Sequence, residues 1–155
     1  NFAVLECARG GILRSGLGFK NCDIGIVTNV AEDHIGLNDI NSIDDMARVK
    51  SVVPESVVRS GYAILNADDE LVYKMSRDLD CNIALFSTKE NNKYIKYHCE
   101  EGGLAAVLEN GYITICQGNW KTRIDQAINI PLTHGGKAEF MIQNITSTNS
   151  RFLKN

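Results

Sequence analysis

Short apolar runs alternate with helix-like stretches over the first ninety residues of the chain. The apolar runs have the length and spacing of strands, and they lie at residues 2–5, 23–29, 61–66 and 82–86. Helices are predicted from residue 43 onward and over residues 70–79. Strands and helices in this alternating order predict an α/β fold, a mostly parallel sheet with flanking helices.

Helix-start and helix-stop signals support this pattern. Ser42 and Asp45 have the spacing of a capping box at the start of the first long helix. Pro54 frees the carbonyl four residues earlier, so we expect a kink or a new helix start there. Asp68 is placed to cap the helix over residues 70–79.

The pattern changes after residue 90. Four short runs alternate between apolar and polar residues, at 94–97, 104–108, 112–116 and 120–124. Asn110-Gly111 supplies a hairpin turn between two of them. These features predict a small antiparallel β ribbon attached to the α/β layer.

The expected organisation is one partial domain over residues 1–144. It divides into an α/β layer, the antiparallel ribbon, and a loop with a helix start, at residues 1–90, 91–131 and 132–144. Residues 145–155 are polar and poor in strong helix formers, and we expect them to be a disordered tail. Because the sequence runs directly into a strand-like segment, we expect it to be a fragment of a longer protein.

Composition narrows the function classes. The formal net charge is −3 and no basic cluster occurs, which argues against nucleic acid or an acidic membrane as the main partner. The five cysteines are odd in number and scattered, without a C-x-x-C motif. That usage favours a reducing, cytoplasmic setting over a disulfide framework or a zinc site.

The stretch over residues 7–18 is rich in glycine and carries Arg9 and Arg14. Four glycines within nine residues predict a mobile or tightly folded loop, and no helix pattern opens from it. The two arginines could reach a phosphate or a carboxylate. A plain surface connection is the alternative, because the G-x-G-x-x-G spacing is missing.

Polar residues gather where the predicted strands end. Glu6 follows the first strand, and Asn29 and His34 belong to the polar cluster after the second. Ligands of open α/β sheets bind just beyond the carboxyl ends of the strands. A carboxylate and an imidazole at adjacent strand tips can share a divalent metal or act in general acid–base catalysis. From the residues alone, a polar cap on a loop is the alternative.

Lys50 lies on the apolar stripe of its helix, seven positions after Ile43. An inward-facing lysine needs a partner or a changed charge. The alternative is that its stem runs along the apolar surface and its amine reaches solvent.

Five motifs stand out along the chain. They are E-x-A-R-G-G-I-L-R-S-G-L-G-F, T-N-V-A-E-D-H, A-R-V-K, N-A-D-D and I-P-L-T-x-G-G-K-A-x-F-M-I-Q-N, at residues 6–19, 28–34, 47–50, 66–69 and 130–144. Together they resemble the central ATPase domain of the Mur ligase family, and the first points to its cyanophycin synthetase branch. The resemblance implies part of a P-loop-type domain, and it is lost after Asn144.

The resemblance implies roles for five residues. Glu6 and His34 correspond to the family's magnesium-binding glutamate and histidine. Lys50 corresponds to a lysine that is carbamylated in many members, and we assign it to catalysis. Asn144 corresponds to an asparagine that contacts adenine, and Asn29 is assigned with it to cofactor binding.

The resemblance also implies the reaction, an ATP-dependent, ADP-forming amide-bond synthesis with Mg²⁺. ATP phosphorylates a carboxylate, and an amine then attacks the acyl phosphate. In the cyanophycin branch the acceptor is an aspartate side chain of an aspartate-rich peptide or polymer, and the amine is arginine. The 155 residues contain no G-x-x-x-x-G-K-[ST] phosphate loop. We therefore expect no ligase turnover by this chain alone. The alternative is a non-catalytic folded remnant, at most a weak nucleotide or metal binder.

Overall fold

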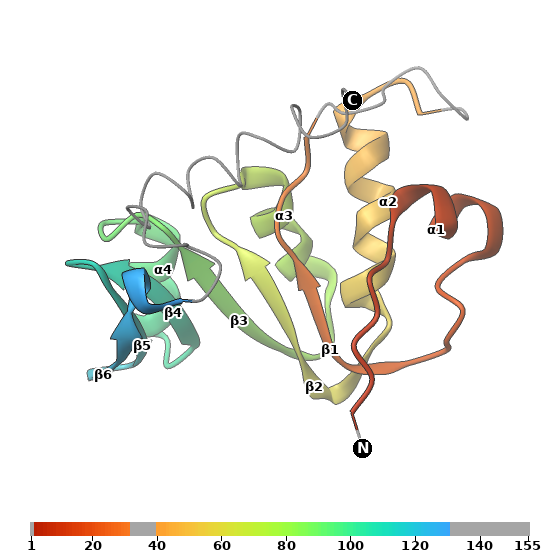
Figure 1. Ribbon diagram of the computed structural model, residues 1–155. Coiled ribbons are helices and arrows are strands. Elements are labelled where there is room, and N and C mark those ends of the chain that lie inside the picture. Colours follow the sequence, from red (N-terminus) through yellow and green to blue (C-terminus); the bar gives the residue numbers. More distant parts are fainter. Residues whose placement is uncertain (1, 32–39, 131–155) are drawn as a thin grey trace.

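The structure is a computed structural model that describes residues 2–31 and 40–130 (Figure 1). The strands are β1 (Cys22–Val27), β2 (Val57–Asn66), β3 (Asn82–Ser87), β4 (Leu104–Glu109), β5 (Tyr112–Gln117) and β6 (Trp120–Gln126). The α-helices are α1 (Arg9–Ser15), α2 (Ile43–Glu55), α3 (Glu70–Met75) and α4 (Lys93–Glu100). Two short 3₁₀ turns lie at Ser76–Asp78 and Ala127–Asn129.

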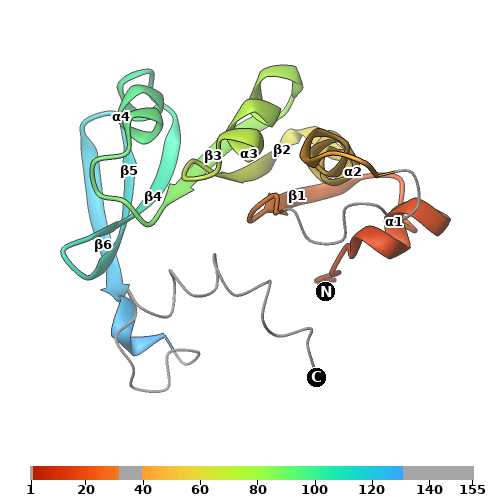
Figure 2. The same cartoon turned by 90° about the horizontal axis from the view of Figure 1, so that it is seen from above.

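All six strands form one sheet in the order of the sequence. β1, β2, β3 and β4 run parallel, while β4, β5 and β6 pair antiparallel. Each parallel crossover contains one helix, and Figure 2 shows α2, α3 and α4 on the same face of the sheet. Crossovers of one hand that advance in one direction place their helices on one side. The predicted fold class is confirmed, with the antiparallel part continuing the same sheet.

Helix α2 begins as its sequence predicts. The Ser42 hydroxyl accepts a hydrogen bond from the Asp45 main chain at 3.1 Å, and the Asp45 carboxylate accepts one from the Ser42 main chain at 3.0 Å. Pro54 does not open a new helix, because α2 runs through it, and that part of the expectation is wrong. It lies one residue before the helix ends at Glu55. In the last turn a missing amide removes a single helical hydrogen bond.

The core lies between the helices and the sheet face that they cover. Leu65 of β2 and Val72 of α3 are fully buried there, and Leu85 of β3 is almost so. Farther along, the sulfur atoms of Cys99 in α4 and Cys116 in β5 lie 3.3 Å apart, both buried. Burial, with the neighbouring thiol, raises the pKa of Cys99 to about 12. The Cys99 thiol is therefore uncharged, and both cysteines pack as part of the apolar core.

The turn between β4 and β5 follows its predicted chemistry. Asn110 and Gly111 both have positive φ, at 51° and 77°. Two successive positive φ values define a type I′ turn, whose twist matches that of the flanking strands. The strands pair directly beside it, at Glu109 and Tyr112.

The predicted strand at residues 94–97 is wrong, because this stretch belongs to helix α4. The Asn92 side chain caps the helix by accepting hydrogen bonds from the main chain of Tyr94 and Ile95. Ile95 and Cys99, four positions apart, are the buried residues of the helix. The helical spacing of these two residues outweighs the short alternation around them.

The N-terminal segment, defined here as residues 2–18, differs from its prediction twice. Residues 2–5 form no strand, and Phe2, Val4 and Leu5 are exposed. An apolar run becomes a strand only where a neighbouring strand takes its main-chain hydrogen bonds, and none does so within the described residues. The glycine-rich stretch contains helix α1, which has no side-chain cap and no buried residue. Gly16, with φ of 69°, ends it.

Smaller differences concern element ends. β2 starts at Val57, four residues before its predicted start, and α3 ends at Met75 and passes into a 3₁₀ turn. The loop with a helix start at residues 132–144 and the tail from residue 145 lie outside the described residues, so those expectations stay predictions. The domain boundaries stay predictions as well. Among the described residues, no helix is long and apolar enough to cross a membrane.

Candidate functional site

The strand-end segment, defined here as residues 28–30, follows β1 at the carboxyl edge of the sheet. Side chains from the next strand and helix hold its main chain. The Asn66 side-chain amide, at the end of β2, donates to the Thr28 carbonyl at 2.7 Å. The Val30 amide donates to Asp69 Oδ2 at 2.7 Å. Asn66 and Asp69 of the N-A-D-D motif therefore hold the main chain of the T-N-V sequence by hydrogen bonds to Thr28 and Val30.

Lys50 provides the third tether. It lies on α2, and its Nζ donates to the Asn29 carbonyl at 2.7 Å. The side chain is half-buried. Of the two alternatives for this inward lysine, the structure has the one with a protein partner. Lys50 and Asn29, assigned from separate motifs, thus lie in direct contact.

The Asn29 side chain is buried, with 9% of its surface exposed. The Thr28 hydroxyl donates to its Oδ1 at 3.3 Å. Within residues 2–31 and 40–130, its amide nitrogen has no hydrogen-bond partner. An amide nitrogen that no described residue accepts from can donate a hydrogen bond to a ligand.

Asp69, and not the predicted Asp68, caps helix α3. Its Oδ1 accepts hydrogen bonds from the main chain of Leu71 at 3.0 Å and Val72 at 3.2 Å. The prediction of Asp68 is wrong by one residue because both positions satisfy the local rule for a cap. The cap of Asp69 and its bond to Val30 come from different oxygens, so one carboxylate joins α3 to the strand-end segment.

Asp68 joins the turn after β2 to the turn after β3. Its carboxylate accepts from the hydroxyls of Ser87 and Thr88, from the Thr88 main chain, and from the Asn92 side chain, all at 2.7–2.9 Å. Burial raises the pKa of Asp68, but the donated hydrogen bonds outweigh it and leave the pKa below its usual value. The carboxylate is therefore held charged as a structural junction.

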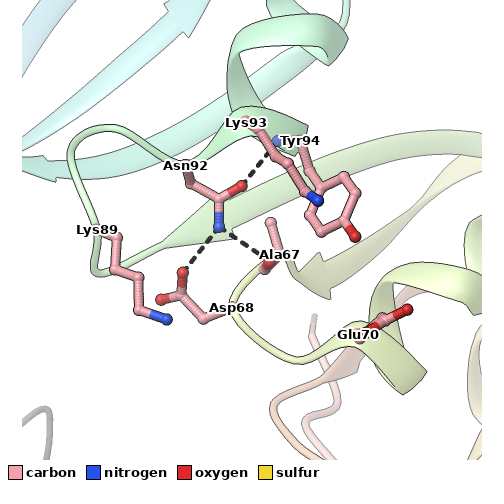
Figure 3. Close-up of a pocket in the computed structure, with 7 residues that line it drawn as sticks. All are labelled: Ala67, Asp68, Glu70, Lys89, Asn92, Lys93 and Tyr94. Carbon is pink, nitrogen blue, oxygen red and sulfur yellow. Dashed lines mark hydrogen bonds between the residues drawn. The ribbon is translucent and has the colours of Figure 1, made fainter.

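A shallow pocket of about 260 Å³ lies over this junction. Figure 3 shows Asn92 bridging Asp68 and the Ala67 main chain, with Lys89 and Lys93 at the rim. Of the residues assigned from the motifs, Glu6, Asn29 and Lys50 are described by the structure, and none of these three lines the pocket. It is a neighbouring feature of the same sheet edge, separate from the strand-end segment.

Glu6 is exposed and has no hydrogen-bond or ion-pair partner among the described residues. Arg14, in the same segment, donates to the Gly10 carbonyl within its own helix at 2.9 Å. His34 and Asn144 lie outside the described residues. In the part of the chain that the structure describes, no three His, Cys, Asp or Glu side chains are grouped for a metal ion.

The sequence pattern did not predict the contacts that Asn66 and Asp69 make with the strand-end segment. Asn66 is 38 positions from Thr28, and Asp69 is 39 from Val30. The N-A-D-D motif that contains them stands out in the sequence, but the residues around it do not indicate which main-chain groups Asn66 and Asp69 contact.

Comparison with known proteins gives a consistent result. The model of the Mur ligase middle domain matches residues 1–146. The chain is 56% identical over 142 residues to cyanophycin synthetase of Geminocystis herdmanii, which covers 92% of this chain and 16% of that protein. It is 51% identical over 154 residues to cyanophycin synthetase of Trichormus variabilis, covering 99% of this chain and 17% of that protein.

A more distant match is the UDP-N-acetylmuramate–L-alanine ligase of Alkaliphilus metalliredigens. It is 29% identical over 80 residues, which is 50% of this chain and 16% of that protein. The chain spans about a sixth of the length of the curated relatives it matches.

Proposed function

The chain belongs to the Mur ligase middle-domain family, and from this premise we propose that it supplies one wall of the Mg²⁺-ATP site of an amide-bond ligase. The ligase would be an ADP-forming acid–amino-acid ligase that joins arginine to aspartate side-chain carboxylates through an acyl phosphate. High identity to two cyanophycin synthetases supports this choice of substrates over those of the muramate ligases.

One observation carries the proposal: Lys50 Nζ donates to the main chain of Asn29 at 2.7 Å. It brings a cationic side chain of one motif against the main chain of another, at the edge where α/β sheets bind ligands. A lysine held there can stabilise negative charge on a transferring phosphoryl group. If Nζ is carbamylated, one N–H remains for the Asn29 carbonyl, and the added carboxylate can hold a metal.

The residues fit the implied groups in their chemistry. The amide nitrogen of Asn29, which has no hydrogen-bond partner among the described residues, can donate to an oxygen of the nucleotide. Glu6 offers a carboxylate with no protein partner in the described part of the chain, and Mg²⁺ prefers such oxygen ligands. Glu6 and His34 would hold Mg²⁺, and Asn144 with Asn29 the nucleotide. When bound, the ion neutralises phosphate charge during transfer.

Calorimetry with Mg²⁺-ATP tests the proposal. The 155 residues lack a phosphate loop, so we expect them to bind only in the millimolar range, on the order of −4 kcal/mol. A longer version with a G-x-x-x-x-G-K-[ST] loop ahead of residue 1 should bind at least about 100-fold more tightly, a difference of roughly 2.8 kcal/mol. Tight binding by the short chain would refute the need for the loop.

A lysine pair supplies the matched control. Lys50→Met in the longer version should weaken Mg²⁺-ATP binding about tenfold, or roughly 1.4 kcal/mol. Lys74→Met should not, because Lys74 is exposed and its contact is an ion pair with Glu70 on the same helix. If neither version binds, the non-catalytic remnant becomes the better description.

A further inference from the structure

Two residues outside the assigned site control the position of the strand-end segment. We propose that Asn66 and Asp69 are positioning residues that hold the main chain of residues 28–30 and so place the Asn29 side chain toward the nucleotide. The functional half of this inference, that the segment places Asn29 toward the nucleotide, rests on the proposed function. The positional half, that Asn66 and Asp69 hold the main chain of residues 28–30, can be tested without any ligand.

The geometry is specific to these side chains. On either side of Asn29, the Thr28 carbonyl is a hydrogen-bond acceptor and the Val30 amide is a donor. Asn66 supplies the donor that Thr28 needs, and Asp69 supplies the acceptor that Val30 needs. The Asn66 amide donates to the Thr28 carbonyl, and the Asp69 carboxylate accepts from the Val30 amide, each at 2.7 Å. With both flanking peptides tied, the main chain at Asn29 has little freedom to turn, and this fixes the direction in which its side chain leaves the backbone.

Each positioning residue also performs a local task with its other polar atom. Asn66 Oδ1 accepts from the Asp68 main chain at 2.8 Å and shapes the turn. Asp69 Oδ1 caps helix α3. The local and the long-range tasks therefore reside on different atoms of one side chain, which allows them to be separated by substitution.

Asp69→Asn separates the two tasks of this residue. Asparagine caps helices as well as aspartate, so its oxygen keeps the α3 cap. Its nitrogen would then face the Val30 amide, where two donors meet and no hydrogen bond forms. Asp69→Ser is the second variant, because serine also caps but has no second oxygen for Val30.

Asn66→Asp is the reciprocal change. It keeps the oxygen that accepts from Asp68 and replaces the donor to Thr28 with a carboxylate oxygen. The variant should free the Thr28 carbonyl while leaving the turn in place. Asn82→Asp is a matched control, since the Asn82 side chain also donates to main-chain carbonyls, but at the far end of the sheet.

The first measurement is amide hydrogen exchange of the 155-residue chain by NMR. A hydrogen-bonded amide exchanges only after opening. We expect the Val30 amide to exchange at least about tenfold faster in Asp69→Asn and Asp69→Ser, with the thermal midpoint within a few degrees of wild type. The Asn29 side-chain amide resonances should shift in these variants and in Asn66→Asp, but not in Asn82→Asp. Unchanged Val30 exchange or unmoved Asn29 resonances would overturn the positional half.

The second measurement follows the Asn29 resonances during a titration with Mg²⁺-ATP, which detects millimolar binding. Wild type should respond, and the three variants at Asn66 and Asp69 should respond at severalfold higher concentration. An equal response in variants whose Val30 exchange or Asn29 resonances have changed would overturn the functional half. If wild type shows no response at all, the proposed function fails, and the exchange experiment still decides whether Asn66 and Asp69 position the segment.

Discussion

The N-terminal segment and the strand-end segment both carry residues that the motifs assign to one site, but the structure holds them differently. Side chains from α2, from β2 and from the N-cap of α3 tie the strand-end segment at three consecutive residues, each at 2.7 Å. The N-terminal segment has an uncapped helix without a buried residue, and its apolar residues Phe2, Val4 and Leu5 are exposed. Assignment to a site follows from residue type, whereas placement in a site follows from contacts distant in sequence.

The largest expected effect concerns the strand beneath the tethers. Leu65 is fully buried in β2 and pairs with Val27, the last residue of β1. Leu65→Ala should lower the free energy of unfolding by about 3 kcal/mol, because it removes buried methyl groups and leaves a cavity. Chemical denaturation monitored by circular dichroism measures this change.

Leu5→Ala is the matched control in the N-terminal segment. Leu5 is exposed in the structure, so its truncation should change stability by less than about 0.5 kcal/mol. A loss for Leu5→Ala close to that for Leu65→Ala would show that residues 2–5 are packed after all.

The same contrast explains which elements the sequence predicts. The start of α2 and the β4–β5 turn were predictable because Ser42 with Asp45, and Asn110 with Gly111, act on their immediate neighbours. The apolar pattern of residues 2–5 was not enough to predict a strand, since a strand also needs a neighbouring strand to take its main-chain hydrogen bonds. At residues 94–97, four residues of alternation were too few to outweigh the cap at Asn92.

The candidate site was predictable in its residue types and not in its connections. Asn29 and Lys50 were assigned from separate motifs, and their contact joins positions 21 apart in sequence. Asp68 and Asp69 are equivalent for the local capping rule, and only the positions of Val30 and of the β3–α4 turn distinguish them. Information of that kind appears only when the chain is folded.

The next largest effect concerns the contribution of two carboxylates, Asp68 and Glu6, to the free energy of unfolding. Asp68 accepts hydrogen bonds from Ser87, Thr88 and Asn92, so its folded pKa is lowered despite burial. Asp68→Asn should cost about 2 kcal/mol at neutral pH, because donors around it lose a charged acceptor. A lowered folded pKa gives stability that is present above the unfolded value, about 3.9, and is lost as the pH falls through the folded value. The difference between wild type and Asp68→Asn should therefore shrink below about pH 4.

Glu6→Gln is the control for this pH profile. Glu6 has no hydrogen-bond or ion-pair partner among the described residues, so removing its charge should leave the stability of the chain unchanged. Thermal unfolding between about pH 2 and 7 measures both profiles across the titration range of carboxyl groups. A constant gap between wild type and Asp68→Asn over this range would contradict the role of the Asp68 charge.

The smallest expected effect compares the two helix starts. The Ser42 side chain caps α2, whose later turns carry Lys50 to the strand-end segment, whereas Ala8 at the start of α1 caps nothing. Ser42→Ala should cost about 1 kcal/mol in denaturant unfolding. Ala8→Ser adds a possible cap to α1, but α1 has no buried residue, so global stability should change by less than about 0.5 kcal/mol. A gain for Ala8→Ser as large as the loss for Ser42→Ala would mean that α1 unfolds together with the sheet, and that the N-terminal segment is coupled to the core despite its exposed surface.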